Sequence, residues 1–286
     1  MTYSTIVTTT ALARHLDDPD WAVFDCRFQL ADPAAGRRAY QRSHIPGACY
    51  ADLDRDLSGP VTADSGRHPL PDPAELATRL GAWGVNENTQ VVAYDDAGGA
   101  IAARLWWLLR WLGHEKVALL DGGFERWRRQ GQLVTDRVAP RAPCAFTPRP
   151  DPHGAIDTDA LRAALAAGGC RLVDARGAER FRGEHEPIDP VAGHVPGAIN
   201  VPYSHNLDEQ GCFRSAAELQ ALYGAALGDV PAGEVVTMCG SGVTACHTLL
   251  ALEMAGWEGA RLYPGSWSEW IRDPKRPVAG PSAAGD

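Results

Sequence analysis

The sequence predicts an α/β protein built from two similar domains, each with a mostly parallel sheet flanked by helices. The chain has 286 residues, a length that suits two domains of ordinary size. In each half, short β-branched runs that stop at turn residues alternate with helical patterns. Such alternation is typical of a parallel sheet covered by helices.

The two halves of the chain repeat each other in the same order. Residues 44–48 read HIPGA and residues 194–198 read HVPGA. Further along, VVAYDD in the first half corresponds to VVTMCG in the second, so that Asp95 aligns with Cys239. Repetition over several separated segments indicates a tandem duplication of one folding unit.

A proline-rich stretch separates the two halves. Between Thr135 and Asp157, prolines stand at positions 140, 143, 148, 150 and 152, and little periodicity remains. Such a stretch is typical of a stiff, exposed linker. We therefore predict domains at residues 1–138 and 157–286, joined by a linker at 139–156.

Composition and charge exclude several classes of function. The net charge of -9 and the lack of a dense Lys/Arg run argue against nucleic-acid binding. No apolar run approaches 18 residues and no basic-then-apolar segment opens the chain, so we expect no membrane association and a cytoplasmic location. Seven cysteines without a CxxC pair argue against a disulfide framework and a zinc site.

The segment MCGSGVTAC, residues 238–246, carries the clearest chemical signal. Cys239 ends an expected strand, and a helix is expected to start near Val243. Gly240 and Gly242 permit a backbone in which successive N–H groups converge on one anion beside the helix N-terminus. A cysteine in such a setting is favoured as thiolate, which makes Cys239 the expected nucleophile, whereas Cys246 should belong to the core.

Four residues recur in both halves, including the half that lacks a cysteine nucleophile. They are Asp25, Asp174, His44 and His194. Repetition in a half without the nucleophile indicates structural roles. We expect the aspartates to anchor local backbone at strand ends and the histidines to serve the turns before Pro-Gly.

The strand ending in cysteine, the loop CGSGVT and the paired HxPGA segments resemble the rhodanese family over nearly the whole chain. Within that family, the loop resembles that of the 3-mercaptopyruvate sulfurtransferases, whereas thiosulfate-specific relatives tend to carry a basic loop. The segment YPGSWSEW, residues 263–270, is similar to the family's C-terminal signature, with Pro264 where an acidic residue is common. The resemblance implies two rhodanese-like domains. The first should be catalytically silent, because the Asp95 carboxylate cannot form a persulfide.

The resemblance also implies a proton relay. Family members with this loop pair the loop serine, here Ser241, with a histidine and an aspartate that map to His68 and Asp54. The enolate released from mercaptopyruvate must be protonated, and histidine titrates near neutrality. The spacing from Asp54 to His68 exceeds the family's usual spacing, and solvation alone is the alternative interpretation of Asp54.

Substrate binding is expected from the loop and from one arginine. The loop residues are Gly240, Gly242, Val243 and Thr244. Arg180, in AERFRG, matches an arginine that binds the donor's anionic group in the family, and a guanidinium suits carboxylate or thiosulfonate oxygens. Arg182 is the alternative candidate for binding the donor. If neither arginine binds the donor, each is expected to form a surface ion pair with Glu179 or Glu184. A second arginine usually follows in mercaptopyruvate enzymes, but this stretch reads EHEPIDP.

These features predict an enzyme that moves sulfur from 3-mercaptopyruvate to cyanide or a thiol acceptor, with thioredoxin among the candidates, through a Cys239 persulfide. We expect no metal and no organic cofactor. Thiosulfate is the alternative donor because the second arginine is missing. A cysteine phosphatase would need an arginine six residues after Cys239, where Ala245 stands. A non-catalytic binding module is the third alternative, and retention of Cys239 argues against it.

Overall fold

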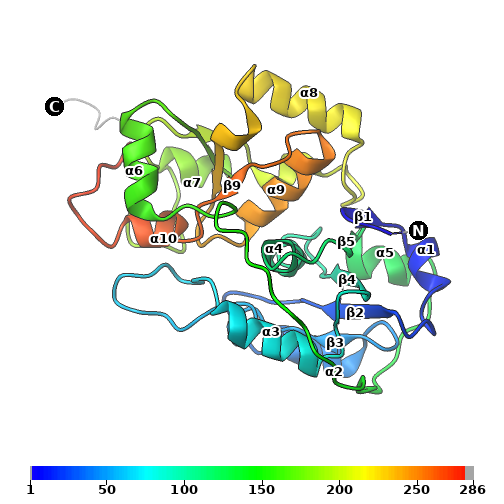
Figure 1. Ribbon diagram of the computed structural model, residues 1–286. Helices are drawn as coiled ribbons and strands as arrows, with labels where there is room; N and C mark the ends of the chain where they lie inside the picture. Colours follow the sequence, from blue (N-terminus) through cyan, green and yellow to red (C-terminus); the bar gives the residue numbers. More distant parts are fainter. Residues whose placement is uncertain (1, 281–286) are drawn as a thin grey trace. The chain divides into compact units, whose positions relative to one another are not determined.

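The β-branched runs of the sequence form the strands of two parallel sheets in this computed structural model, which describes residues 2–280 (Figure 1). The chain divides into two compact units. Unit 1 comprises Met1–Gly59, Leu70–Asp151 and Asp208–Phe213, and unit 2 comprises Pro60–Pro69, Pro152–Leu207 and Arg214–Asp286. The predicted pair of α/β sheets flanked by helices is confirmed. Two short segments, Pro60–Pro69 and Asp208–Phe213, are grouped with the unit opposite to their half of the sequence.

Unit 1 holds, among the described residues, a five-stranded sheet in the order β1-β5-β4-β2-β3, with every pairing parallel. Its inner strands β2 and β4 are buried at every position, as expected for strands of a parallel sheet covered by helices. The elements are β1 (Ile6–Val7), α1 (Thr9–Ala13), β2 (Trp21–Asp25), α2 (Ala35–Arg42), β3 (Cys49–Tyr50), α3 (Pro73–Ala82), β4 (Gln90–Tyr94), α4 (Ala102–Trp111), β5 (Val117–Leu120) and α5 (Gly123–Arg129).

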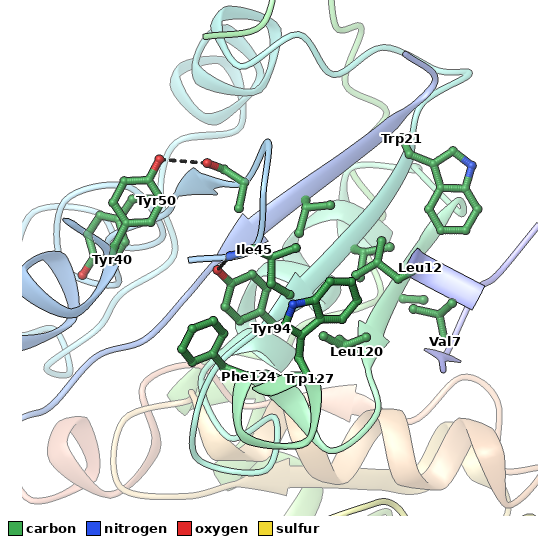
Figure 2. Packing of buried hydrophobic residues seen from close by; sticks show 14 residues of the cluster. Val7, Leu12, Trp21, Tyr40, Ile45, Tyr50, Tyr94, Leu120, Phe124 and Trp127 are labelled. Carbon is green, nitrogen blue, oxygen red and sulfur yellow. Dashed lines mark hydrogen bonds between the residues drawn. The ribbon is translucent and has the colours of Figure 1, made fainter. Parts of the chain in front are cut away.

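Aromatic side chains fill one part of the unit 1 core. Figure 2 shows Tyr94 of β4 beside Phe124 and Trp127 of α5, and the rings of Tyr94 and Phe124 stack with centroids 5.7 Å apart. The buried hydroxyl of Tyr40 donates to the Ala48 carbonyl at 2.8 Å, drawn as a dashed line in Figure 2. Buried hydroxyl groups are costly unless they are hydrogen-bonded, so this contact allows Tyr40 to pack in the core.

Unit 2 holds a shorter parallel sheet in the order β7-β6-β8-β9 within the described chain. Strand β8 is buried throughout and is covered by the almost wholly buried α9. The elements are α6 (Thr158–Ala166), β6 (Arg171–Asp174), α7 (Ala178–Arg182), β7 (Ile199–Asn200), η1 (Tyr203–Asn206), α8 (Ala216–Leu227), η2 (Ala232–Glu234), β8 (Val235–Met238), α9 (Thr244–Met254), β9 (Arg261–Leu262) and α10 (Ser266–Trp270).

The sequence repeat corresponds to a repeated ion pair at the end of one strand in each sheet. Asp25 accepts the backbone N–H and the guanidinium of Arg27, and Asp174 does the same with Arg176. Each arginine also donates to the carbonyl just before its HxPGA motif, at 2.7 Å in unit 1 and 2.8 Å in unit 2. The expected anchoring of local backbone by both aspartates is thus confirmed, and each pair also ties the strand to a distant turn.

The repeated histidines are equally structural. His44 bonds through Nδ1 to the Tyr40 carbonyl at 2.7 Å, and its ring stacks on that of Tyr40. His194 bonds through Nδ1 to the Phe181 carbonyl at 2.8 Å and stacks on Phe181. Both histidines therefore have structural roles, as their recurrence predicted, and each one also binds a carbonyl of the helix that precedes its Pro-Gly turn.

The proline-rich stretch lies extended with mostly exposed side chains, but its backbone is attached to unit 1. The N–H groups of Cys144, Arg149 and Asp151 donate to carbonyls that lie on or just after α3 and α4, at 2.8 to 2.9 Å. These bonds fix the stretch as far as Asp151. Within the described chain, no helix is long and apolar enough to cross a membrane.

Candidate active site

Cys239 stands directly after β8, at the carboxyl edge of the unit 2 sheet. Its exposed fraction is 2%, and residues 239–243 form a short loop before α9 begins at Thr244. Ligands of open α/β sheets bind at this edge, beyond the carboxyl ends of the strands. The sequence prediction of strand, loop and helix over residues 238–246 is confirmed.

The segment from Tyr263 to Trp270 supports this loop. Ser266 Oγ accepts the Cys239 N–H at 3.0 Å, and the Trp267 N–H donates to the Cys239 carbonyl at 3.0 Å. Ser266 is fully buried and has a φ of 53°, a strained value for a residue other than glycine. Its hydroxyl also donates to the Tyr263 carbonyl, and these bonds hold the strained residue under the cysteine.

Gly242 is required where the loop passes over Pro264. Its φ is +74°, and a Cβ at this position would collide with the Pro264 carbonyl. Only glycine meets both conditions without strain. Position 264, where the family resemblance suggested an acidic residue, thus acts here through its backbone.

The corresponding loop of unit 1 is filled by its own carboxylate. Asp95, fully buried, accepts the N–H groups of Ala97, Gly99, Ile101 and Ala102, each at 2.8 Å. In unit 2, the N–H groups of the loop residues 240, 241 and 243 have no acceptor among residues 2–280. The first loop therefore already holds an anion, whereas the second presents donors to a ligand.

Ser241 forms a hydrogen bond with His68. Ser241 Oγ lies 2.7 Å from His68 Nδ1, and both side chains are buried. His68 belongs to Pro60–Pro69, which is held in unit 2 by bonds such as that from the Arg67 N–H to Ser268 Oγ at 3.0 Å. The structure thus brings together two of the three residues that the resemblance assigned to a proton relay.

Asp54 belongs to unit 1 and has an exposed side chain. Its backbone N–H donates to the Asp52 carboxylate at 3.1 Å, in a turn just before Pro60–Pro69. Its assignment to the relay stays a prediction.

Arg180 lies on α7 in a network of carboxylates. Its Nε bonds to both oxygens of Glu186 at 3.0 Å, and its Nη2 lies 3.0 Å from Asp189 Oδ2. Burial raises the pKa of Glu186, but hydrogen bonds from Arg180 and from the N–H groups of Asp189 and Ile188 outweigh it, so that this pKa lies below its ordinary value. By contrast, Arg182 is exposed and pairs with Glu184.

Sequence reasoning missed Arg67 and Asp189. Arg67 Nη1 lies 2.6 Å from Asp189 Oδ1, so this one carboxylate binds both Arg67 and Arg180. A Cβ on Gly240 would lie 3.3 Å from Arg67 Nη2 and 3.6 Å from both Nη atoms of Arg180. The sequence did offer one sign of Arg67: it directly precedes His68, and two adjacent residues can reach the same loop.

Val243 and Thr244 lie where the loop passes into α9, as the predicted start of the helix near Val243 implied. Val243 is the buried N-cap of α9, and Thr244 is its half-buried first residue. Cys246 is fully buried, with its Sγ 3.3 Å from the Gly242 carbonyl, which confirms the prediction that it belongs to the core.

Comparison with known proteins gives one consistent result. The model of the rhodanese-like domain matches residues 8–130 and 157–273. A probable 3-mercaptopyruvate sulfurtransferase of Pseudomonas aeruginosa is 52% identical over 281 residues, covering 98% of this chain and 99% of that protein. A putative thiosulfate sulfurtransferase of Mycobacterium tuberculosis is 41% identical, covering 90% of each chain. The structure of a 3-mercaptopyruvate sulfurtransferase from Leishmania major superimposes with a TM-score of 0.84 at 29% identity, covering 95% of this chain and 76% of that one.

Proposed function

The chain belongs to the rhodanese-like domain family, and from that premise we propose that it is a sulfurtransferase that takes sulfur from 3-mercaptopyruvate onto Cys239. The observation that carries this proposal is the buried cysteine at the end of β8, in a loop whose N–H groups at residues 240, 241 and 243 have no acceptor within the described chain. The relatives named above as sulfurtransferases support it.

In the first half-reaction, the Cys239 thiolate attacks the thiol sulfur of the donor. A sulfur–sulfur bond forms, the carbon–sulfur bond breaks, and its electron pair leaves on carbon as the enolate of pyruvate. The thiol proton of the donor stays on the outer sulfur and is then lost to solvent, which leaves the persulfide as an anion. The enolate takes a proton to give pyruvate. Ser241 is the proposed proton donor. His68 is proposed to return a proton to the Ser241 hydroxyl, because His68 Nδ1 lies 2.7 Å from Ser241 Oγ.

In the second half-reaction, an acceptor removes the outer sulfur. Cyanide or an acceptor thiolate, for which thioredoxin is a proposed source, attacks the outer sulfur, and the sulfur–sulfur bond breaks to return the Cys239 thiolate. Between the two steps, the persulfide anion is stabilised by the loop N–H groups and by the positive end of α9.

The test is the intact mass of the protein after incubation with each donor separately. We expect the wild type to gain one sulfur atom from 3-mercaptopyruvate, located on Cys239 by peptide mapping. Cys239→Ser should gain none and should lose turnover with every donor while remaining folded. Cys170→Ser is the matched control, since Cys170 is a half-buried cysteine of the same unit at the start of β6. Sulfur uptake or turnover by Cys239→Ser would contradict the proposed mechanism.

A further inference from the structure

Two guanidinium groups converge on the residue that follows the cysteine nucleophile. Arg67 comes from Pro60–Pro69 and Arg180 from α7, and both belong to unit 2. The Cβ position of Gly240 lies 3.3 Å from Arg67 Nη2 and 3.6 Å from Arg180 Nη1. A side chain at residue 240 would therefore compete for the space in front of both guanidinium groups.

Two of the three guanidinium nitrogens nearest to Gly240, Arg67 Nη2 and Arg180 Nη1, have no partner in the described part of the chain. Arg180 donates through Nε to Glu186 and through Nη2 to Asp189, and its Nη1 has no partner in the described part of the chain. Arg67 donates through Nη1 to Asp189, whereas its Nη2 and its buried Nε have no partner among those same residues. A buried donor without an acceptor, such as Arg67 Nε, is costly, so this arrangement favours binding of a ligand that supplies acceptors.

Asp189 keeps the two cations together. Its side chain is 2% exposed, and its two oxygens bind the two guanidinium groups separately, Oδ1 to Arg67 and Oδ2 to Arg180. Without this carboxylate, two like charges at close range would repel each other. Asp189 therefore positions Arg67 and Arg180 side by side and leaves one edge of each toward Gly240.

We propose that Arg67 is a second donor-binding residue, which together with Arg180 binds the carboxylate of 3-mercaptopyruvate beside Cys239. This inference rests on the proposed function. A carboxylate presents two oxygens to a pair of guanidinium edges, and charge-assisted hydrogen bonds of this kind are strong and directional. The stretch EHEPIDP contributes no arginine itself, but its Asp189 fixes an arginine from a distant part of the sequence.

A hollow beside this cluster gives the ligand an approach. It has a volume of about 380 Å³, and Arg67, Asp189 and Ser268 line it together with apolar residues such as Ile188. Ser268 also contacts the loop, because its N–H donates to the Gly240 carbonyl at 2.9 Å. A small anionic molecule in this hollow would thus meet Arg67 at the edge of the cysteine loop.

The experiment compares two donors that differ only in the carboxylate. Steady-state kinetics are measured with 3-mercaptopyruvate and with mercaptoacetone, the methyl ketone that lacks the carboxylate, for the wild type, Arg67→Ala, Arg67→Lys and Asp189→Asn. Arg67→Ala should raise the KM for mercaptopyruvate by about 10- to 100-fold, the loss of one charge-assisted contact, and should leave kcat/KM for mercaptoacetone within about threefold. Arg67→Lys should recover little of this loss, and Asp189→Asn should raise the same KM while kcat is largely retained.

Arg182→Ala is the matched control, because Arg182 lies on the same helix as Arg180 but is exposed and paired with Glu184. It should leave both donors unaffected. A wild type that cannot use mercaptopyruvate would overturn the proposed function and this inference with it. A wild type that does use it, with an Arg67→Ala variant that is unchanged or equally impaired toward both donors, would overturn only the role of Arg67.

Discussion

The hydrogen bond between Ser241 and His68 should affect two sulfur donors differently, 3-mercaptopyruvate and thiosulfate, both of which appear in the names of relatives of this chain. Mercaptopyruvate leaves as an enolate that needs a proton, whereas thiosulfate leaves as sulfite, a stable anion. A hydroxyl group held 2.7 Å from an imidazole nitrogen can supply a proton and have it replaced. At the scale of the residue, we therefore propose that this pair assists the reaction with mercaptopyruvate and not the reaction with thiosulfate.

Ser241→Ala and His68→Ala should each lower the mercaptopyruvate rate by about 10²- to 10⁴-fold, the usual size of general acid–base effects, and should lower the thiosulfate rate much less. Parallel assays with both donors measure this difference. Equal losses with both donors would mean that the pair shapes the loop and does not relay a proton. A faster wild-type reaction with thiosulfate would reverse the proposed order of donors.

At the scale of the element, the loop between β8 and α9 is held from below by the turn into α10. Cys239 is bonded on its N–H side to Ser266 and on its carbonyl side to Trp267. Gly242 passes over the Pro264 carbonyl at a φ of +74°, with no room for a Cβ. The conformation of the loop is thus set by a segment more than twenty residues away in sequence.

Gly242→Ala should distort the loop, because it combines a left-handed φ with a clash against backbone. We expect the free energy of unfolding to fall by about 1–3 kcal/mol. The rate of sulfur transfer should fall by more than the decrease in the folded fraction of the protein can explain. Gly233→Ala is the control, since Gly233 has no atom within 4 Å of its Cβ position. Denaturant unfolding and donor kinetics on both variants measure the effects, and wild-type kinetics in Gly242→Ala would refute the requirement for glycine.

At the scale of the whole molecule, the same structural unit occurs twice, with opposite contents in the equivalent loop. In unit 1, the Asp95 carboxylate accepts four backbone N–H groups, and in unit 2 the corresponding position is Cys239. A carboxylate that is already bonded this way has neither a nucleophilic role toward sulfur nor room for a bound anion. We propose that unit 1 is catalytically silent and that its loop has become a structural anchor.

Asp95→Ala should destabilise unit 1 by about 3 kcal/mol or more, because it leaves several buried N–H groups without an acceptor. Hydrogen exchange measured by mass spectrometry should show faster exchange in β4 and α4, with persulfide formation at Cys239 retained under conditions where the chain stays folded. Asp96→Ala is the control, since Asp96 is the exposed neighbour. Loss of persulfide formation in a folded Asp95→Ala variant would give unit 1 a chemical role.

The sequence by itself determined the features that depend on contiguous residues. The alternation of β-branched runs and helical patterns predicted the parallel sheets, and the repeat predicted two units. The segment 238–246 predicted the strand, the cysteine loop and the start of α9, since all three lie within nine consecutive residues. The recurrence of Asp25 and Asp174 in both halves likewise indicated local anchoring, because each aspartate binds a residue two positions away.

Only the tertiary structure decided how distant side chains meet: the family resemblance implied the pair of Ser241 and His68, but nothing in the sequence pointed to the pair of Arg67 and Asp189. Pro60–Pro69 is grouped with unit 2, although it lies in the first half of the sequence, and this placement puts His68 at Ser241 and Arg67 at Asp189. These contacts join residues separated by 173 and 122 positions. No local periodicity or turn chemistry encodes such pairs, because they result from the packing of whole segments and from the need of each buried charge for a partner.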